Sequence, residues 1–263
     1  MVKKFIIGAL LLLSSLSIYA QVPMLPSMSI PSLGGGTNAH AATYTGDGVF
    51  VGVASLHSKH LNFASASLLW NTGWDVFGAK YSMMIAQPML MNGNYQQHFF
   101  PVVYITPLQL SWDLGNTKLQ GSYSALIGRD LPVDAHLISV KATQYILDGK
   151  YSINGGVTYE HRIARPELGR TLGSAMVFEA NVSRHFRNGS TVGVFGYYNT
   201  NSSPEIIEGR TLFNDISGTR GIGIDTSHPV GKHLFLNGKY IYDLQPNQVT
   251  RCNKVVFSIA YKF

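Results

Sequence analysis

The sequence predicts an all-β fold, a transmembrane antiparallel β-barrel of about 12 strands with an N-terminal segment in its lumen. Three observations predict it: a secretory signal at the N-terminus, a low content of charged residues, and a recurring two-residue alternation of apolar and polar side chains. A period of two is typical of strands, and no stretch shows a sustained helical period. In lipid, such strands must close into a barrel because open edges leave backbone groups unpaired.

The first 20 residues have the features of a cleavable secretory signal. Lys3 and Lys4 precede an apolar run over residues 5–13, and a Ser-rich stretch then leads to Ala20. A short basic region, a core of this length and a small residue at the exit predict cleavage after Ala20. The core is too short to span a membrane as a helix, which needs about 20 apolar residues.

The composition separates a membrane barrel from a soluble domain. Only 13% of the residues are charged, while 45% are hydrophobic and 11% aromatic; soluble domains average about 25% charged. A wall that faces lipid needs few charges, so we expect a bacterial outer-membrane location rather than a soluble β-sandwich. The net charge is +6, and 6 − 2 = +4 once Lys3 and Lys4 leave with the signal. This surplus is mild, so no nucleic-acid partner is expected. The single cysteine, Cys252, excludes an internal disulfide.

Turn signals divide residues 48–263 into 12 expected strands. Five tight connections, most with Asn, Asp or Gly, alternate with connections that mostly run from about seven to eighteen residues. Short turns facing the periplasm and longer outer loops are typical of outer-membrane barrels, and an even strand count places both chain ends in the periplasm. The expected strands are residues 48–57, 61–70, 74–87, 99–114, 117–128, 135–147, 150–161, 173–186, 190–200, 219–228, 234–244 and 253–263, and the tight connections are 71–73, 115–116, 148–149, 187–189 and 229–233.

The last strand shows the alternation most clearly. Large apolar side chains occupy one face, and Lys254, Ser258, Ala260 and Lys262 occupy the other. This strand must present the lipid face and also close the barrel. We therefore expect it to carry the signal for the barrel assembly machinery, in Phe257, Ile259, Tyr261 and Phe263. Aromatic girdles near both membrane surfaces are expected around Trp70, Trp74, Trp112, Tyr159 and Tyr198.

The alternation also predicts which charged side chains face the lumen, which twelve strands are enough to leave open. Positively and negatively charged side chains occur on strands that face each other across the lumen. Such residues can pair across the interior and brace the wall, or they can line a pore that admits polar solutes. Buried charges normally need partners, which favours bracing. The expected lumen-lining residues are Lys80, Asp113, Lys118, Glu160, Glu179, Asp225, Lys239 and Asp243.

The segment of residues 21–47 differs from the strands that follow. It is apolar and broken by prolines before Gly34, Gly35 and Gly36, and proline is excluded from strand interiors. Fully extended, it could reach roughly 80 Å at about 3.3 Å per residue. It is therefore long enough to fold back into the lumen as a plug; the alternative is a periplasmic tail.

Seven arginines lie in or beside the expected outer loops, where the outer leaflet carries phosphate. Guanidinium binds phosphate bidentately, so we expect outer-membrane lipid and lipopolysaccharide as partners, with a plain solvated surface as the alternative. These residues are Arg129, Arg162, Arg165, Arg170, Arg210, Arg220 and Arg251. His57 and His60 lie on the same side but lack a Cys or carboxylate companion at ligand spacing, so no metal site is expected.

Searches for catalytic motifs are negative. The sequence contains no His-Glu-x-x-His, no Gly-x-Ser-x-Gly and no phosphate loop, so we expect neither an enzyme nor a cofactor. An interfacial lipid hydrolase would need a Ser and a His paired near the lipid. Many residues could be assigned those roles, and no motif chooses among them.

Several stretches resemble the outer-membrane transporter family of the meta-pathway of phenol degradation, which is distantly similar to the long-chain fatty-acid channels. The resemblance spans about residues 44–263 and rests on Trp70-Asn71-Thr72-Gly73-Trp74, residues 107–116, Tyr159-Glu160 and residues 257–263. It implies a channel for passive uptake of small hydrophobic or aromatic molecules, with the N-terminal segment entering the lumen. The Asn-Pro-Ala signature of the fatty-acid channels is missing. A surface adhesin or structural barrel, and an interfacial lipid hydrolase, are the alternatives.

Overall fold

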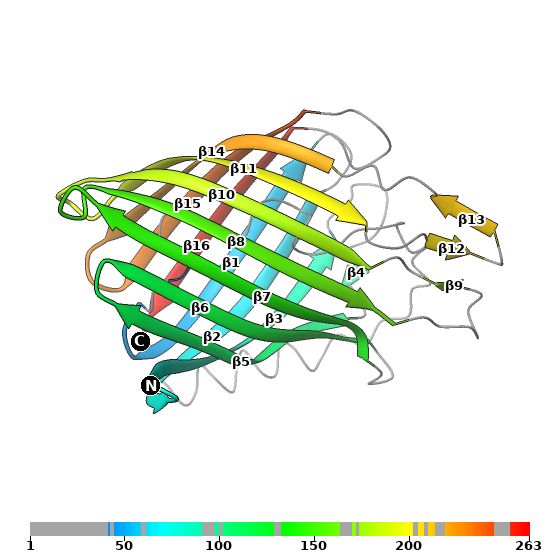
Figure 1. The fold of residues 1–263 in the computed structure, drawn as a ribbon, viewed down its shortest axis with the longest axis horizontal. Helices are drawn as coiled ribbons and strands as arrows, with labels where there is room; N and C mark the ends of the chain where they lie inside the picture. Colours follow the sequence, from blue (N-terminus) through cyan, green and yellow to red (C-terminus); the bar gives the residue numbers. More distant parts are fainter. Residues whose placement is uncertain are drawn as a thin grey trace.

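Twelve long antiparallel strands form a closed barrel in the computed structural model (Figure 1). Each strand pairs with its neighbours in the chain, and β1 pairs with β16 to close the wall. The barrel strands are β1 (Gly48–Ser58), β2 (Asn62–Val76), β3 (Ala79–Leu90), β5 (Val102–Leu114), β6 (Thr117–Gly128), β7 (Val133–Ile146), β8 (Tyr151–Arg162), β10 (Ala175–His185), β11 (Thr191–Asn201), β14 (Thr219–Val230), β15 (Leu234–Asp243) and β16 (Lys254–Lys262). The predicted antiparallel barrel of about 12 strands is confirmed.

The structure describes residues 42, 45–58, 62–90, 98–99, 102–128, 133–163, 170–171, 174–201, 205–207, 210–213, 219–244 and 253–263. Four further short strands lie outside the barrel wall. β4 (His98–Phe99) pairs with β3, while β9 (Arg170–Thr171), β12 (Glu205–Ile207) and β13 (Arg210–Phe213) form a separate small sheet, which the sequence did not predict. The signal peptide and most of the segment 21–47 lie outside the described residues.

The two ends of the barrel differ in the length of their connections. Tight connections lie at 77–78, 115–116, 147–150, 186–190 and 231–233, at the end where the C-terminus lies, called here the tight-turn end (Figure 1). Most of the connections at the opposite, long-loop end are longer. Two connections at this end are short: three residues separate β1 from β2, as the sequence predicted, and four separate β6 from β7, fewer than the six predicted.

The first tight turn is not where the sequence predicted it. Residues 71–73 lie inside β2, and the turn is formed by Phe77 (φ 52°) and Gly78 (φ 71°). Positive φ at both central residues is the requirement of a type I′ hairpin turn. The Asn-Thr-Gly stretch instead forms a bulge, where the pairing of β2 with β3 shifts register between Asn71 and Asp75. Asn71 is buried and accepts a hydrogen bond from Ser82 Oγ at 2.8 Å. This bond keeps β2 paired with β3 at the bulge.

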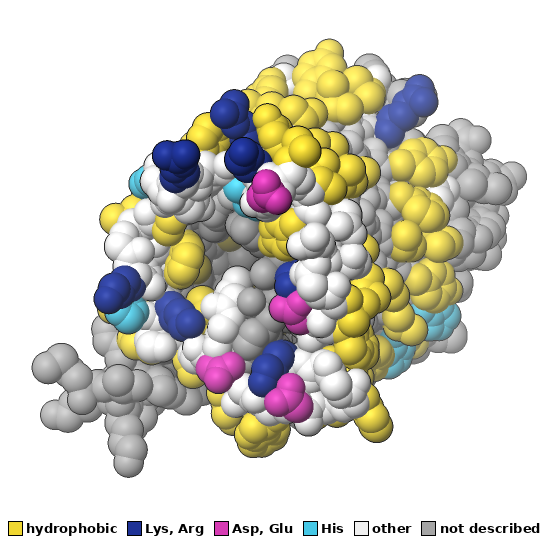
Figure 2. Space-filling model, turned by 60° about the vertical axis from the view of Figure 1, so that its left-hand side comes forward, with side chains coloured by type: hydrophobic (Ala, Val, Ile, Leu, Met, Phe, Trp, Pro, Cys, Tyr) yellow, Lys and Arg dark blue, Asp and Glu magenta, His cyan; other side chains and the backbone are white. Residues whose placement is uncertain are grey.

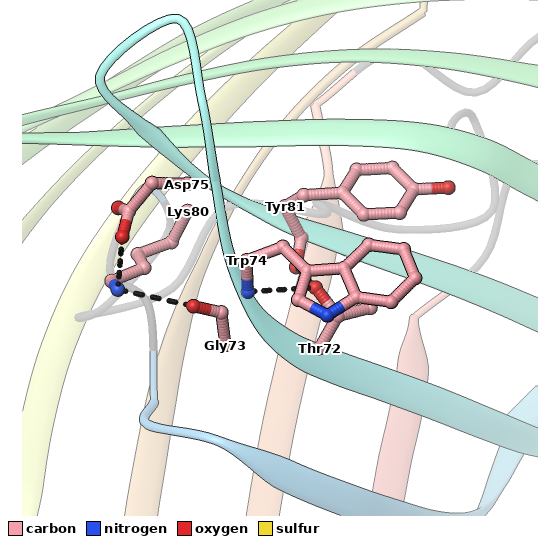
Figure 3. Close-up of polar contacts among 6 residues, drawn as sticks. All are labelled: Thr72, Gly73, Trp74, Asp75, Lys80 and Tyr81. Atoms are coloured by element: carbon pink, nitrogen blue, oxygen red, sulfur yellow. Dashed lines mark hydrogen bonds and ion pairs between the residues drawn. The ribbon is translucent and has the colours of Figure 1, made fainter.

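The bulge is stabilised by side chains of its own residues (Figure 3). Thr72 Oγ1 donates to the carbonyl of Tyr81 at 2.9 Å and accepts from the Trp74 amide at 3.1 Å. The ring of Trp74 stacks on that of Tyr81, with centroids 6.2 Å apart. Trp70 and Trp74 therefore lie on one strand, four residues apart, rather than on either side of a turn.

The outer face of the barrel is apolar. On β14, Ile222 and Ile224 are about half exposed, while the intervening Gly223 and the following Asp225 are buried. The same alternation runs along the other long strands, and hydrophobic side chains cover much of the outside in Figure 2. An apolar surface around a closed antiparallel barrel is what lipid requires, so the barrel lies in the outer membrane.

Among the described residues, no helix has the length and apolar character needed to cross a membrane.

Candidate functional site

A row of hydrogen-bonded polar side chains crosses the inner wall. Thr143 Oγ1 donates to Asn154 Oδ1 at 2.7 Å, Asn154 Nδ2 to Asn181 Oδ1 at 2.9 Å, and Asn181 Nδ2 to Asp225 Oδ1 at 2.8 Å. These four residues, here the polar belt, come from β7, β8, β10 and β14, and all are buried. Each donor thus points in the same direction, toward the carboxylate of Asp225. A chain of this kind fixes the register of the strands that it joins.

Gly193 lets the belt pass over β11, which lies between β10 and β14. A Cβ atom at this position would lie 2.4 Å from Asp225 Oδ1, 2.4 Å from Ser183 Oγ and 2.7 Å from Asn181 Nδ2. These distances are far shorter than side-chain contacts allow. The glycine therefore provides the space in which Asn181 reaches Asp225.

Two further glycines, on β14, accommodate aromatic rings of β11. A Cβ at Gly223 would meet Phe195 Cζ at 2.5 Å, and one at Gly221 would meet Tyr197 Cε1 at 2.4 Å. The rings therefore lie across β14 along the wall instead of projecting into the lumen. They form a buried apolar cluster with Ile241 of β15, against which Val256 packs. Sequence analysis missed this use of glycine because the partners come from neighbouring strands.

Predicted lumen residues occur in the same region. Lys239 is the register partner of Asp225, and its Nζ lies 4.8 Å from the centroid of the Phe195 ring. Asp243 accepts a hydrogen bond from the Tyr197 hydroxyl and forms a buried ion pair with Lys254 Nζ at 2.7 Å. Lys254 was assigned to the polar face of its strand but not to the lumen set. The contacts are those of bracing, since each charge has a partner within the wall.

Glu160 and Arg162 form a second buried ion pair, near the long-loop end of β8. Arg162 Nε donates to Glu160 Oε1 at 2.7 Å, and both side chains are almost fully buried. The prediction that Arg162 contacts lipid phosphate is therefore wrong. Residue 162 shares the parity of Glu160, so its side chain points into the lumen. Among the residues that the structure describes, none gives a hydrogen bond to the buried Glu160 Oε2. Glu179, also predicted for the lumen, lies on the inner face of β10 and is partly buried.

Three predicted lumen residues lie at the tight-turn end, close to solvent. Asp113 pairs with Lys118, and Lys80 Nζ pairs with Asp75 at 3.0 Å and donates to the Gly73 carbonyl at 3.2 Å (Figure 3). Figure 2 looks toward this end and shows a hollow bordered by charged side chains of both signs. These residues therefore belong to the mouth of the barrel rather than to its middle.

One residue before the first strand contacts the inner wall. The Ala42 amide donates to Thr143 Oγ1 at 3.2 Å, and Ala42 is buried. Thr143 lies on β7, on the inner face, far from β1 in strand order. The polar belt thus ends on the backbone of the chain that precedes the barrel.

The other arginines assigned to lipid phosphate are described only in part. Arg220 is exposed on the outer face of β14 at the long-loop end, opposite Tyr198 of β11. Arg170 and Arg210 lie in β9 and β13, without described side chains. Arg129, Arg165 and Arg251 lie outside the described residues, as does His60. The four residues of the expected assembly signal are all exposed on the outer face: Phe257, Ile259, Tyr261 and Phe263.

Three Ser–His contacts bear on the lipid hydrolase alternative. His161 Nδ1 lies 3.2 Å from Ser174 Oγ, and His228 Nδ1 lies 2.6 Å from Ser190 Oγ. The third pair, His185 and Ser152, lies on the inner face. A catalytic His needs its second ring nitrogen oriented by an acid or amide. Within the part of the chain that the structure describes, neither outer His has such a partner. No group of three or more metal-binding side chains occurs among the described residues.

Comparisons with known proteins agree with this architecture. No family model and no curated protein matches in sequence. The solved COG4313 outer membrane channel from Pseudomonas putida F1 is similar in structure, with a TM-score of 0.64 and 10% identity over 86% of this chain and 100% of that chain. The NanC porin gives 0.55 and 9% over 82% and 100%, and the KdgM porin gives 0.52 and 9% over 81% and 99%. At these identities the likeness shows the fold, a porin-like outer-membrane barrel.

Proposed function

We propose that the protein is an outer-membrane channel for passive uptake of small hydrophobic or aromatic molecules. The observation that carries the proposal is the flat inner wall. Large side chains such as Phe195 and Tyr197 lie over Gly223 and Gly221 and pack along the wall against Ile241. Side chains that filled the lumen would instead project across it. A wall built this way keeps these large side chains out of the centre of the barrel, which supports a channel.

The choice of solute follows the resemblance of residues 70–74 and 107–116 to the transporters of phenol degradation. The apolar cluster of Phe195, Tyr197 and Ile241 and the polar belt are both buried within the wall, so they shape the lumen without contacting the solute. The solved relatives named above, a channel and two porins, make a transport role the natural starting hypothesis.

Swelling of liposomes that contain the purified barrel tests this function. Phenylalanine and a sugar alcohol of similar size are compared, because neither crosses lipid freely. We expect swelling with both and a faster rate with phenylalanine. Absence of swelling with either solute would favour a structural or adhesive barrel. Equal rates with the two solutes would reject the aromatic preference alone.

We also propose that residues 21–47 enter the lumen and limit its bore. The contact between the Ala42 amide and Thr143 Oγ1 supports this, because it requires the chain to cross from β1 to the inner face of β7. Deleting residues 22–33 is expected to raise single-channel conductance and to weaken discrimination among solutes. Unchanged conductance and discrimination would show that the segment is a tail.

Assembly is proposed to depend on the last strand. Phe263 donates its amide to the Val49 carbonyl at 2.9 Å, and its ring meets that of Tyr261 edge to face at 4.9 Å. Loss of Phe263 removes contacts at the seam where β16 meets β1. We expect its deletion to reduce the heat-modifiable protein in the outer membrane strongly, and normal levels would contradict the role of this strand as an assembly signal.

A further inference from the structure

Two histidines lie directly opposite each other on the outer face, near the long-loop end. His136 of β7 and His161 of β8 are register partners. Both belong to the outward-facing set, since Ile138 and Tyr159, two residues away on the same strands, are 55% and 37% exposed. Directly opposed residues of antiparallel strands have Cβ atoms about 4.5–5.5 Å apart. The two imidazoles are therefore close neighbours at the membrane surface.

Hydrogen bonds hold the two rings from opposite sides. His136 Nδ1 lies 2.6 Å from the Tyr123 hydroxyl of β6, and His161 Nδ1 lies 3.2 Å from Ser174 Oγ, just before β10. In the barrel β6 and β10 flank the β7–β8 pair. Because the two nitrogens of an imidazole lie on different sides of the ring, a ring held at Nδ1 from the flanking strand leaves Nε2 available to a ligand between the two histidines.

The partners of Nδ1 suit a metal-binding tautomer. A hydroxyl oxygen can accept a hydrogen bond from Nδ1–H, which leaves a lone pair on Nε2. Metal-ligating histidines almost always donate their other ring N–H in this way. Two Nε2 atoms on one metal would lie roughly 3.3 Å apart, from bonds of about 2.05 Å at a tetrahedral angle. Opposed residues on paired strands can reach this separation by side-chain rotation.

We propose that His136 and His161 form a two-histidine site for a borderline divalent cation such as Cu²⁺, Ni²⁺ or Zn²⁺. Imidazole suits these metals, whereas Ca²⁺ and Mg²⁺ require oxygen ligands. The pair supplies two ligands, and water fills the remaining positions. The site is independent of the lumen, so it does not rest on the transport function.

Copper binding to the folded, full-length mature barrel in detergent tests the site. Cu²⁺ is added in equimolar amounts, and electron paramagnetic resonance reports nitrogen ligation while a chelator competition gives the affinity. We expect His136→Ala and His161→Ala each to weaken binding about a hundredfold, and Ser174→Ala about tenfold, because a partner that orients a ligand typically contributes 10–100-fold. Pulsed measurements should show the remote Nδ1 of two equivalent imidazoles.

His228→Ala is the matched control. His228 is also exposed and lies 2.6 Å by Nδ1 from a serine, Ser190, but its register partner on β15 is Leu236. We expect this variant to bind copper as the unmodified protein does. Heat modifiability of every variant confirms that the barrel is folded. Unchanged affinity in the His136→Ala, His161→Ala double variant, or a loss of binding in His228→Ala of the same size, would overturn the proposal.

Discussion

The inner and outer walls of the barrel are built from the same strands but by different rules. On β14, Ile222 and Ile224 face outward, and each needs only to be apolar. The inward Gly221, Gly223 and Asp225 each depend on a side chain of β11 or β10 that lies over or against them. The outer wall is thus specified residue by residue, whereas the inner wall is specified by combinations of residues on different strands.

A charge on the outer wall gives the largest expected effect. Ile224 lies near the middle of β14 and is 56% exposed. A Lys at the bilayer midplane costs about 2–4 kcal/mol. We expect Ile224→Lys to lower the free energy of unfolding by about 3 kcal/mol in urea titrations of the barrel in lipid vesicles, with Ile224→Met close to unmodified protein. A stable Ile224→Lys barrel would mean that this face does not contact lipid.

The next test adds one methyl group to the inner wall or to the outer wall and compares the loss of stability. Gly193→Ala places a Cβ against Asp225, Ser183 and Asn181, whereas a Cβ at Gly196 on the outer face meets only ordinary contact, 3.7 Å from a backbone oxygen. Overpacking costs about 1–3 kcal/mol, so we expect Gly193→Ala to destabilise by about 2 kcal/mol. Gly196→Ala should be neutral or slightly stabilising. The same titrations check both, and equal effects would contradict the role of Gly193.

The role of Gly193 shows which features could be predicted from the sequence and which could not. Alternation identified the strands, the lipid face and the lumen side of Glu160, Asp225 and Asp243, because each follows from one strand alone. The partners of Asp225 could not be predicted, because they depend on the register of β10, β11 and β14. Arg162 was misplaced for a related reason: its strand extends one residue further than expected, so the side chain keeps the inward parity of Glu160.

The first tight turn was also misplaced, because local composition alone does not decide where a strand ends. Asn71-Thr72-Gly73 has the composition of a hairpin turn, yet Asn71 bonds inward to Ser82 and the strand continues. The real turn places Phe77 in the left-handed region, which its sequence does not signal. Local composition was outweighed by pairing with β3 and by the contacts of Thr72.

Loss of one member of the polar belt should have a smaller effect than overpacking. Asn154→Leu leaves Thr143 and Asn181 without one hydrogen bond each. Removing one partner of a buried pair costs about 1–3 kcal/mol, and we expect about 1.5 kcal/mol here because Asn181 keeps other contacts. Ile153→Leu, one residue away on the outer wall, is the control and should change the same vesicle unfolding titration by less than about 0.5 kcal/mol. Equal effects of the two changes would show that the belt does not stabilise the wall.

The smallest effect on stability is expected at the mouth, where the inner wall meets solvent. Lys118 pairs with Asp113, whose side chain is 74% exposed, and such pairs contribute about 0–1 kcal/mol. Lys118→Met should therefore change unfolding by less than about 0.5 kcal/mol. Because this pair lies beside the hollow at the tight-turn end, removing the positive charge should shift the reversal potential of single channels toward cation preference. A shift in stability without a shift in reversal potential would place Lys118 in the bracing network of the inner wall and remove it from the path of ions.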